Sequence, residues 1–239
     1  MSNLLVHKLN SLIQLSSEEK QALENLPVVV RASPARTDIV REGDRPIQCA
    51  FLLEGWACRY KLLDAGRRQI MSFHTAGDFL ELQSLHLHTV DNSVSALTDA
   101  RVALISHENL LGLAGRYPNV GTALWRNSLV DAAIFREWLV GMGQRSARQR
   151  IAHLLCELYA KCEAVGLAQD FRCPLPITQI ELADALGMSS VHVSRVLSDL
   201  RSEVVTISGK QLVINDWERL KAEGEFDPTY LHLGNQQAA

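Results

Sequence analysis

ITQIELADALGMSSVHVSRVLSDLR, residues 177–201, predicts two helices joined by a tight turn. Thr178 followed three residues later by Glu181 has the spacing of a capping box, which satisfies the free N–H groups at a helix start. Gly187 stands where the first helix ends, because glycine adopts the left-handed conformation of a C-cap without steric cost. Ser189 is placed to cap the second helix.

The second of these helices has two contrasting faces. Apolar side chains recur on one face at steps of three and four residues: Val193, Val196, Leu197 and Leu200. The other face carries hydroxyl, imidazole and basic groups: Ser190, His192, Ser194, Arg195 and Arg201. Such groups reach base edges and phosphates when a helix lies in a DNA major groove. The alternative is an ordinary helical hairpin with a solvated polar face.

Two short β-rich runs follow, at residues 204–207 and 211–214, on either side of the turn Ser208-Gly209-Lys210. This pattern predicts a β-hairpin directly after the second helix. Helix, turn, helix and hairpin in this order predict a winged helix-turn-helix, which favours DNA binding over the ordinary hairpin.

This order resembles the CRP/FNR superfamily of bacterial transcription regulators. Residues 217–220 and 225–233 also resemble a common bacterial branch of that superfamily. The resemblance covers nearly the whole chain and implies an α+β fold with an N-terminal β-roll, similar to the cyclic-nucleotide-binding jelly roll. We expect a β-roll sensor domain at 1–117, a dimerisation helix at 118–143, a Crp-type winged helix-turn-helix at 144–220 and a C-terminal tail at 221–239.

Composition is ordinary for a cytoplasmic protein. The chain has 239 residues, of which 47% are hydrophobic, and no apolar run reaches the roughly 18–20 residues that span a bilayer. The N-terminus lacks a signal-peptide pattern. The five cysteines are odd in number and not closely paired, which indicates reduced thiols. The net charge is −3, and residues 145–220 carry nine Lys or Arg against nine Asp or Glu, so any attraction to DNA phosphates must be local.

The first half of the chain predicts a short helix followed by a β-rich domain. Ser16-Ser17-Glu18-Glu19 is a capping box, and the helix should run to about Asn25. β-Rich runs then alternate with Gly-containing turns, which suggests a sandwich or barrel. The clearest runs are 28–30, 49–53, 58–62 and 101–105.

The ligand chemistry of the β-roll can be compared with that of the superfamily. Relatives that bind a cyclic nucleotide carry a Gly-Glu turn and, about a dozen residues later, an arginine that neutralises the cyclic phosphate. Here the turn is Gly77-Asp78-Phe79-Leu80-Glu81 and the later segment is residues 90–96, but no Arg or Lys occurs between Gly77 and Arg101. We therefore expect no cyclic AMP binding. Arg67 and Arg68 could contribute a charge from a neighbouring strand, but a solvated hairpin is favoured for them.

Other cofactors also lack support, so we expect none. Relatives with an iron–sulfur cluster place several cysteines near the N-terminus, whereas the first cysteine here is Cys49. His74, His86 and His88 leave haem or a metal as an alternative if residues 86–88 form a strand, but exposed loop histidines are favoured. Cys49 and Cys58 could face each other across a hairpin as a redox pair, although inert buried thiols are favoured.

Residues 118–143 predict one long helix with two apolar lines. The first line recurs at steps of three and four: Val120, Ala123, Asn127, Val130, Ile134, Trp138 and Gly141. Leu124, Phe135 and Leu139 form the second. One line can pack on the roll and the other on a partner, and we favour a symmetric dimer over a core helix in a monomer. Asn127 could fix the register of such a dimer.

Residues 141–144, Gly-Met-Gly-Gln, are the predicted hinge into the DNA-binding domain. They lack the third glycine and the preceding strand of a dinucleotide-binding motif. Arg145, Arg148 and Arg150 are expected to contact solvent or phosphate near the hinge. The next helix should bury Ile151, Leu154, Leu155 and Leu158.

The resemblance also implies specific DNA contacts. FNR-like relatives carry Glu-x-x-Ser-Arg in the recognition helix, and the matching run here is Val191-His192-Val193-Ser194-Arg195. Arg195 is expected to contact guanine bidentately. Val191 replaces the glutamate, so the half-site should depart from TTGAT at that position. The full set of expected DNA-binding residues is Thr178, Gln179, Ser189, Ser190, Val191, His192, Ser194, Arg195 and Lys210.

The sequence therefore predicts a homodimeric, sequence-specific transcription regulator that binds a palindromic promoter site. Its expected partners are double-stranded DNA, a second copy of the chain and RNA polymerase, and no membrane. The alternative is a small-ligand or cyclic-nucleotide binding module that acts through protein contacts. An enzyme is not expected, because no P-loop, Gly-x-Ser-x-Gly or His-Glu-x-x-His motif occurs.

Overall fold

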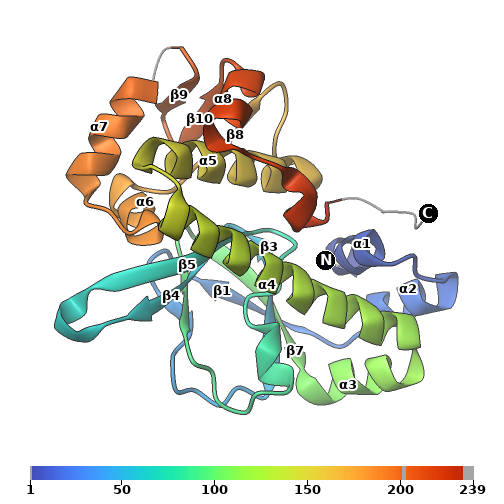
Figure 1. The fold of residues 1–239 in the computed structure, drawn as a ribbon. Helices are drawn as coiled ribbons and strands as arrows, with labels where there is room; N and C mark the ends of the chain where they lie inside the picture. The colour runs from blue at the N-terminus through green and yellow to red at the C-terminus, as the bar shows by residue number, and fades with distance from the viewer. Residues whose placement is uncertain (1, 201–202, 234–239) are drawn as a thin grey trace. The chain divides into compact units, whose positions relative to one another are not determined.

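The computed structural model describes residues 2–200 and 203–233 (Figure 1). The chain divides into two compact units. We call the first the roll unit; it is formed mainly by residues 1–61 and 73–132. We call the second the winged unit; it comprises residues 62–72 and 133–231. Within the described ranges, none of the helices combines the length and apolar character needed to cross a membrane.

Antiparallel strands build the β-roll as two sheets. One sheet has the order β1-β7-β3 and consists of β1 Val29–Ser33, β7 Ala100–Ser106 and β3 Gln48–Glu54. The other has the order β2-β6-β4-β5 and consists of β2 Asp38–Val40, β6 Ser93–Ala96, β4 Trp56–Leu62 and β5 Arg68–Thr75. The four strands expected from the sequence are confirmed, and β2, β5 and β6 are additional.

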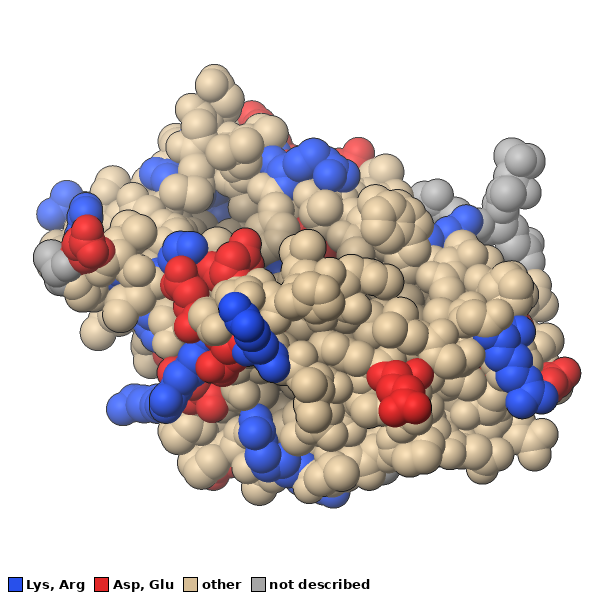
Figure 2. All heavy atoms as spheres, turned by 90° about the horizontal axis from the view of Figure 1, so that it is seen from below, with Lys and Arg blue, Asp and Glu red and all other residues tan. Residues whose placement is uncertain are grey.

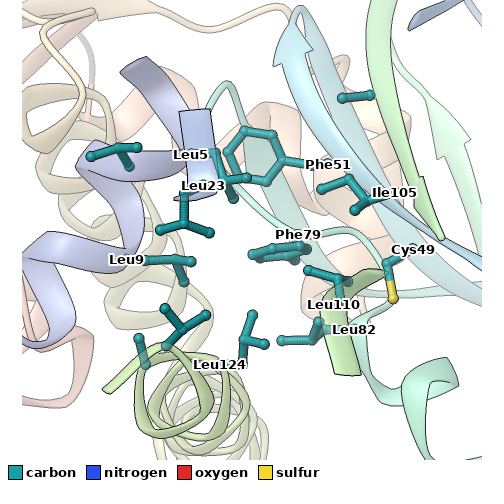
Figure 3. Close-up of a cluster of buried hydrophobic side chains, with 14 of the residues drawn as sticks. Leu5, Leu9, Leu23, Cys49, Phe51, Phe79, Leu82, Ile105, Leu110 and Leu124 are labelled. Carbon is teal, nitrogen blue, oxygen red and sulfur yellow. The ribbon is translucent and has the colours of Figure 1, made fainter. Parts of the chain in front are cut away.

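Three short helices, together with the first turns of the long helix described below, pack on one sheet of the roll and complete its core (Figure 3). They are α2 Ser17–Glu24 and two helices that the sequence patterns did not predict, α1 Ser2–Leu12 and α3 His107–Arg116. The expected capping box at Ser16 and Glu19 begins α2. Phe51 and Phe79 meet edge to face at a centroid distance of 5.0 Å in this cluster. Burial of such aromatic pairs is a main source of core stability.

The long helix α4 runs over Pro118–Gln144, as predicted. The first apolar line lies on its inward side, where Val120 and Ala123 are fully buried. Asn127 is also buried within the chain, so the idea that it fixes the register of a dimer is not supported. The second line divides, because Leu124 is buried whereas Leu139 is 72% exposed.

The predicted hinge at residues 141–144 is wrong, because these residues continue α4. The helix ends at Gln144, Arg145 and Ser146 form the connection, and α5 begins at Ala147 and runs to Ala164. Ser146 and Gln149 form a capping box that starts α5. Such a box satisfies two backbone donors within a short connection, so glycine is not required for the break.

The winged unit packs its remaining helices and strands around α5, whose residues Ile151, Leu154, Leu155 and Leu158 are buried as expected. Helices α6 Gln179–Leu186 and α7 Ser190–Leu200 form the helix-turn-helix. The wing sheet has the order β8-β10-β9, with β8 Arg172–Pro174, β10 Gln211–Ile214 and β9 Val205–Ser208. Helix α8, Trp217–Gly224, packs on α5 and crosses the expected 220/221 boundary. Short 3-10 helices are η1 Asp64–Gly66, η2 Leu82–Leu85 and η3 Pro228–Leu231.

Candidate nucleic-acid interface

The turn between α6 and α7 has the expected caps. The Thr178 hydroxyl accepts the backbone N–H of Glu181, and the Glu181 carboxylate accepts the backbone N–H of Thr178, which completes the capping box. Gly187 is left-handed, with φ 63°, and its N–H donates to the carbonyl of Ala183. The Ser189 hydroxyl accepts the backbone N–H of His192 at 3.2 Å. Local hydrogen bonds thus define the ends of α6 and the start of α7.

Helix α7 presents the predicted polar face to solvent. Val193, Val196, Leu197 and Leu200 are buried on its other side, as predicted. Val191, His192 and Arg195 are exposed, whereas Ser190 and Ser194 are half-buried. Val191 is apolar yet 68% exposed, so packing within the chain does not explain why a valine stands there. Arg201, expected on the same face, lies outside the described residues.

Two of the expected phosphate-binding hydroxyls take part in helix caps. The Thr178 hydroxyl also donates to Glu181 at 2.8 Å, so both its donor and its acceptor function are used within the capping box. Ser189 retains its O–H donor, because its cap bond uses only the oxygen. Gln179 is exposed at the start of α6, where backbone N–H groups attract anions. The structure therefore leaves Ser189 and Gln179 better placed than the Thr178 side chain.

The tip of the wing is a two-residue turn. Gly209 and Lys210 both have positive φ, 57° and 62°, as a type I′ hairpin turn requires. The side chain of Lys210 is exposed at this tip. A third strand, β8, pairs with β10 and supports the hairpin. The sequence patterns did not predict β8, because its three residues are too few to show a period.

The arginines next to the α4–α5 connection differ from the prediction, because all three contact protein groups. Arg148 makes two hydrogen bonds to the Glu223 carboxylate, at 2.8 and 2.9 Å. Arg145 donates to Glu137 at 2.6 Å, and Arg150 donates to the carbonyl of Leu186 at 2.7 Å. The partners of Arg148 and Arg150 are 75 and 36 residues away along the chain, so the local sequence does not reveal them.

The hairpin β4–β5 also reaches the helix-turn-helix. Arg68 was expected on a solvated hairpin, but its Nε donates to the Asp184 carboxylate on α6 at 2.8 Å. The Gln69 side chain donates to the carbonyl of Ala185 at 3.2 Å. Arg67 is exposed, as expected. Residues 62–72 thus pack with the winged unit, although β4 and β5 belong to a sheet of the roll.

The interior of the roll holds one buried arginine that sequence reasoning missed. Arg59 on β4 is 2% exposed and donates to Asp131 on α4 at 2.9 Å and to the carbonyl of Leu80 at 2.8 Å. Its guanidinium is thus committed to protein groups. Strand β6, which includes the segment where cyclic-nucleotide-binding relatives carry their arginine, is Ser-Val-Ser-Ala and fully buried. These residues do not fit a cyclic nucleotide, because no cation is offered to its phosphate.

Glu81, the glutamate of the Gly-Glu turn, is also buried. One of its oxygens accepts the backbone N–H of Ala50 at 2.9 Å. Desolvation raises the pKa of this carboxyl to about 7, against lowering contributions from hydrogen bonds to Ser84 and Ala50 and from Arg59. A raised pKa of this kind suits a buried carboxyl whose charge is only partly balanced.

The histidines and cysteines considered as alternative sensing groups form neither a metal site nor a redox pair among the residues that the structure describes. His86 and His88 lie in an exposed loop after η2 rather than on a strand, as favoured from the sequence. No group of three metal-ligating side chains occurs among the residues that the structure describes. All five cysteines are buried thiols outside any disulfide. Cys49 and Cys58 do not face each other across a hairpin, because β3 and β4 belong to different sheets.

The chain carries a net charge of −3. Figure 2 shows basic and acidic side chains lying beside one another on one face. The overall charge of the chain therefore offers no attraction to a polyanion.

Comparisons with known proteins match both halves of the chain. The model of the Crp-like helix-turn-helix domain matches residues 149–223, and that of the cyclic nucleotide-binding domain matches residues 30–117. The transcriptional activator protein FnrL of Cereibacter sphaeroides is 29% identical over 216 residues, which cover 88% of this chain and 86% of FnrL. The nitrogen fixation regulation protein FixK of Rhizobium meliloti is 29% identical and covers 73% of this chain and 75% of FixK.

Solved structures agree with these relatives. The structure of FixK2 from Bradyrhizobium japonicum has a TM-score of 0.74 and 26% identity, and the match covers 82% of this chain and 97% of FixK2. A CooA mutant from Carboxydothermus hydrogenoformans, at a TM-score of 0.67 and 17% identity, shares the fold. A β-roll, a long helix and a winged helix-turn-helix in this order, together with these relatives, show that the chain is a DNA-binding transcriptional regulator of the CRP/FNR family.

Proposed function

We propose that this regulator binds a palindromic promoter site as a homodimer, with α7 of each subunit in the major groove. The exposed face of α7 carries this proposal. Val191, His192 and Arg195 point to solvent without structural partners among the described residues. Two such helices would enter successive grooves about one helical turn, ~34 Å, apart.

Within this complex we assign two kinds of contact. Arg195 reads guanine, and Val191 packs on a thymine methyl, because a valine side chain cannot accept a hydrogen bond. Phosphates are held by the groups at the ends of α6 and α7 and by the wing tip: Thr178, through its backbone, with Gln179, Ser189, Ser190 and Lys210. His192 and Ser194 complete the face.

The outward face of α4 supports the homodimer. Trp125 and Leu139 are 64% and 72% exposed, and Leu129 lies between them at 47%. With Ala132, Arg136 and Gly143 they follow alternating steps of four and three residues. That spacing is the seam of a parallel two-helix coiled coil. We call these six residues the α4 seam.

The remaining assignments rest on the family. We propose domain boundaries at 1–117, 118–143, 144–220 and 221–239. We also propose that the protein acts in the cytoplasm, contacts RNA polymerase as a partner and has no catalytic activity. Constitutive binding without a cyclic nucleotide is expected, because the guanidinium of Arg59 is already committed.

The decisive experiment is DNA binding by an Arg195→Ala variant. Fluorescence anisotropy against fragments of the upstream region of its own gene, at fixed salt, should show selective binding by the wild-type protein without cyclic AMP. Arg195→Ala should lose about 1–3 kcal/mol of specific binding and keep its non-specific binding. Arg41→Ala is the matched control, because this exposed arginine lies on the roll. Unchanged discrimination between the site and scrambled DNA would reject the role of Arg195.

A further inference from the structure

A chain of buried hydrogen bonds crosses the winged unit. Nε1 of Trp138 on α4 donates to Oε2 of Glu157 on α5 at 3.0 Å, and the Tyr230 hydroxyl lies 2.8 Å from the same oxygen. This hydroxyl also lies 3.0 Å from Nε2 of His153, and Nδ1 of His153 lies 3.0 Å from the carbonyl of Gly224. The chain therefore joins α4 and α5 to the end of α8 and to η3.

The surroundings hold this chain in a dry, closely packed place. His153 and Glu157 are 5% and 2% exposed. The ring of Tyr230 stacks on His153 at a centroid distance of 5.7 Å, and Phe226 meets His153 edge to face at 5.3 Å. A Cβ on Gly224 would lie 2.6 Å from the backbone nitrogen of His153, so glycine is what allows the end of α8 to approach α5 this closely.

The number of protons in the chain follows from its hydrogen bonds. A carbonyl only accepts, so Nδ1 of His153 must carry a proton to bond with Gly224. The Tyr230 hydroxyl has one proton and cannot donate to both His153 and Glu157. A neutral His153 beside a Glu157 carboxylate would therefore leave lone pairs facing each other across one short contact. Both contacts are formed only if one further proton is present, on Nε2 or on the carboxyl.

The two positions of this proton are connected through Tyr230. With the proton on Glu157, the carboxyl O–H donates to the hydroxyl oxygen, and the hydroxyl O–H donates to Nε2 of His153. With the proton on Nε2, the N–H donates to the hydroxyl oxygen, and the O–H donates to the carboxylate. The two arrangements differ by a shift of two protons and have the same total charge. Tyr230 itself stays protonated, because burial, followed by the Glu157 charge, raises its pKa.

Charged groups from the elements packed around the chain act on it: Glu137 on α4, Arg145 in the α4–α5 connection, Lys161 on α5 and Glu225 after α8. Burial is the largest effect and raises the pKa of Glu157, against the lowering charge of Lys161. Burial also lowers the pKa of His153, and the Arg145 charge acts in the same direction. Both directions place the shared proton on Glu157.

We propose that His153, Tyr230 and Glu157 form a proton-binding site that fastens the C-terminal segment, residues 224–231, to α4 and α5. The site holds one proton, which the imidazole and the carboxyl share through the Tyr230 hydroxyl. When alkaline pH removes it, the single N–H of His153 serves either Tyr230 or Gly224, and one contact to the segment is lost. A second proton at acid pH would make both neighbours of Tyr230 donors, so the fastening is strongest at intermediate pH.

The proton count can be measured by NMR on the full chain labelled with ¹³C-glutamate and ¹⁵N-histidine. Loss of a signal in Glu157→Gln and in His153→Gln assigns the two resonances. At neutral pH, Nδ1 should be protonated, and Nε2 and the Glu157 carboxyl together should carry one proton. A carboxylate beside an unprotonated Nε2, or protons on both groups, would overturn the proposal.

Amide hydrogen exchange of residues 225–231 tests the fastening. Tyr230→Phe keeps the stacked ring and removes the hydroxyl, so exchange at neutral pH should rise roughly 2- to 10-fold, the effect of losing one hydrogen bond. Tyr159→Phe is the matched control, because the Tyr159 hydroxyl also bonds a carboxylate, that of the exposed Glu163, at 3.2 Å. Equal exchange in Tyr230→Phe and the control would contradict the proposal.

Glu157→Gln distinguishes a proton-binding site from a merely structural contact. The glutamine amide accepts from Trp138 and donates to Tyr230, as the protonated carboxyl does, but it has no proton to lose. Alkaline pH should therefore raise exchange in the segment by a similar factor in the wild-type protein and not in Glu157→Gln. The same pH dependence in both proteins would overturn the proposal. These measurements contain no DNA, so their outcome is independent of the proposed promoter binding.

Discussion

Glu81 lies in the interior of the roll unit, 1% exposed, between the backbone of Ala50 and the loop that carries Ser84. Burial dominates its ionisation and raises its pKa from 4.5 to about 7. Its charge, once formed, also helps to raise the pKa of the Cys49 thiol to about 12, although burial is the larger cause. The ionisation of this one carboxyl therefore affects the stability of the fold.

We predict that Glu81 makes the folded protein less stable as pH rises. The folded state keeps the proton between pH 4.5 and about 7, whereas the unfolded state releases it. The stabilising contribution is full below pH 4.5 and is lost as pH rises through about 7, by up to about 3 kcal/mol. Urea unfolding across this range should show a steeper decline for the wild-type protein than for Glu81→Gln. Glu54→Gln, on the exposed end of β3, is the control, and identical slopes for Glu81→Gln and wild type would contradict the assignment.

The residues that sequence patterns placed wrongly are mostly arginines. Arg68, Arg145, Arg148 and Arg150 were expected in solvent or at phosphate, yet each has a protein partner. A long cationic side chain reaches several ångströms, and its partner is often distant in sequence. The sequence correctly placed Arg68 on a hairpin and the other three near the start of a helix, but it did not predict the groups that they contact. Arg195, by contrast, was expected to be exposed and is exposed.

At the scale of elements, helices with caps were the most predictable. α2, α6 and α7 begin at the expected capping residues, because a capping box is a local signal of four residues. Strands β2, β6 and β8 have three or four residues each and were missed. Strand β5 has eight residues, but RQIMSFHT does not alternate polar and apolar side chains. Such strands are defined by their neighbours in the sheet rather than by their own sequence.

Helix α4 carries a prediction at this scale. Leu129→Glu and Leu139→Glu each place a charge in the α4 seam, where burial of an unpaired charge is costly. Each variant should therefore shift the protein from dimer to monomer. Both side chains are exposed in the single chain, so the fold of the monomer should be retained, which circular dichroism checks.

Sedimentation equilibrium measures the change in oligomeric state. Val29→Glu is the matched control, because Val29 is an exposed apolar residue on β1 outside the seam. Arg136→Leu should act in the opposite direction and tighten the dimer, since it removes a pair of like charges from the seam. Dimers of unchanged affinity in both glutamate variants would exclude this face of α4 as the subunit interface.

At the scale of the whole chain, the two compact units are not two simple sequence segments. The turn and adjoining ends of β4 and β5, residues 62–72, group with the winged unit, and α4 contributes to both. Sequence reasoning divides a chain into consecutive segments, so it could not predict that residues 62–72 group with the winged unit. The link is made by side chains: Arg68 binds Asp184, and Gln69 binds the carbonyl of Ala185.

The contact between Arg68 and Asp184 should couple the hairpin to the helix-turn-helix. The two side chains are 28% and 23% exposed, so the pair is partly screened and should be worth about 0.5–1 kcal/mol. A double-mutant cycle of Arg68→Ala and Asp184→Ala, measured by urea unfolding, should give a coupling energy of that size. Arg67→Ala is the control, because Arg67 is the residue next to Arg68 and is exposed. If the hairpin also positions α6 for DNA, both single variants should weaken specific binding equally and the double variant no further. Fully additive effects in unfolding and in binding would show that the hairpin and α6 act independently.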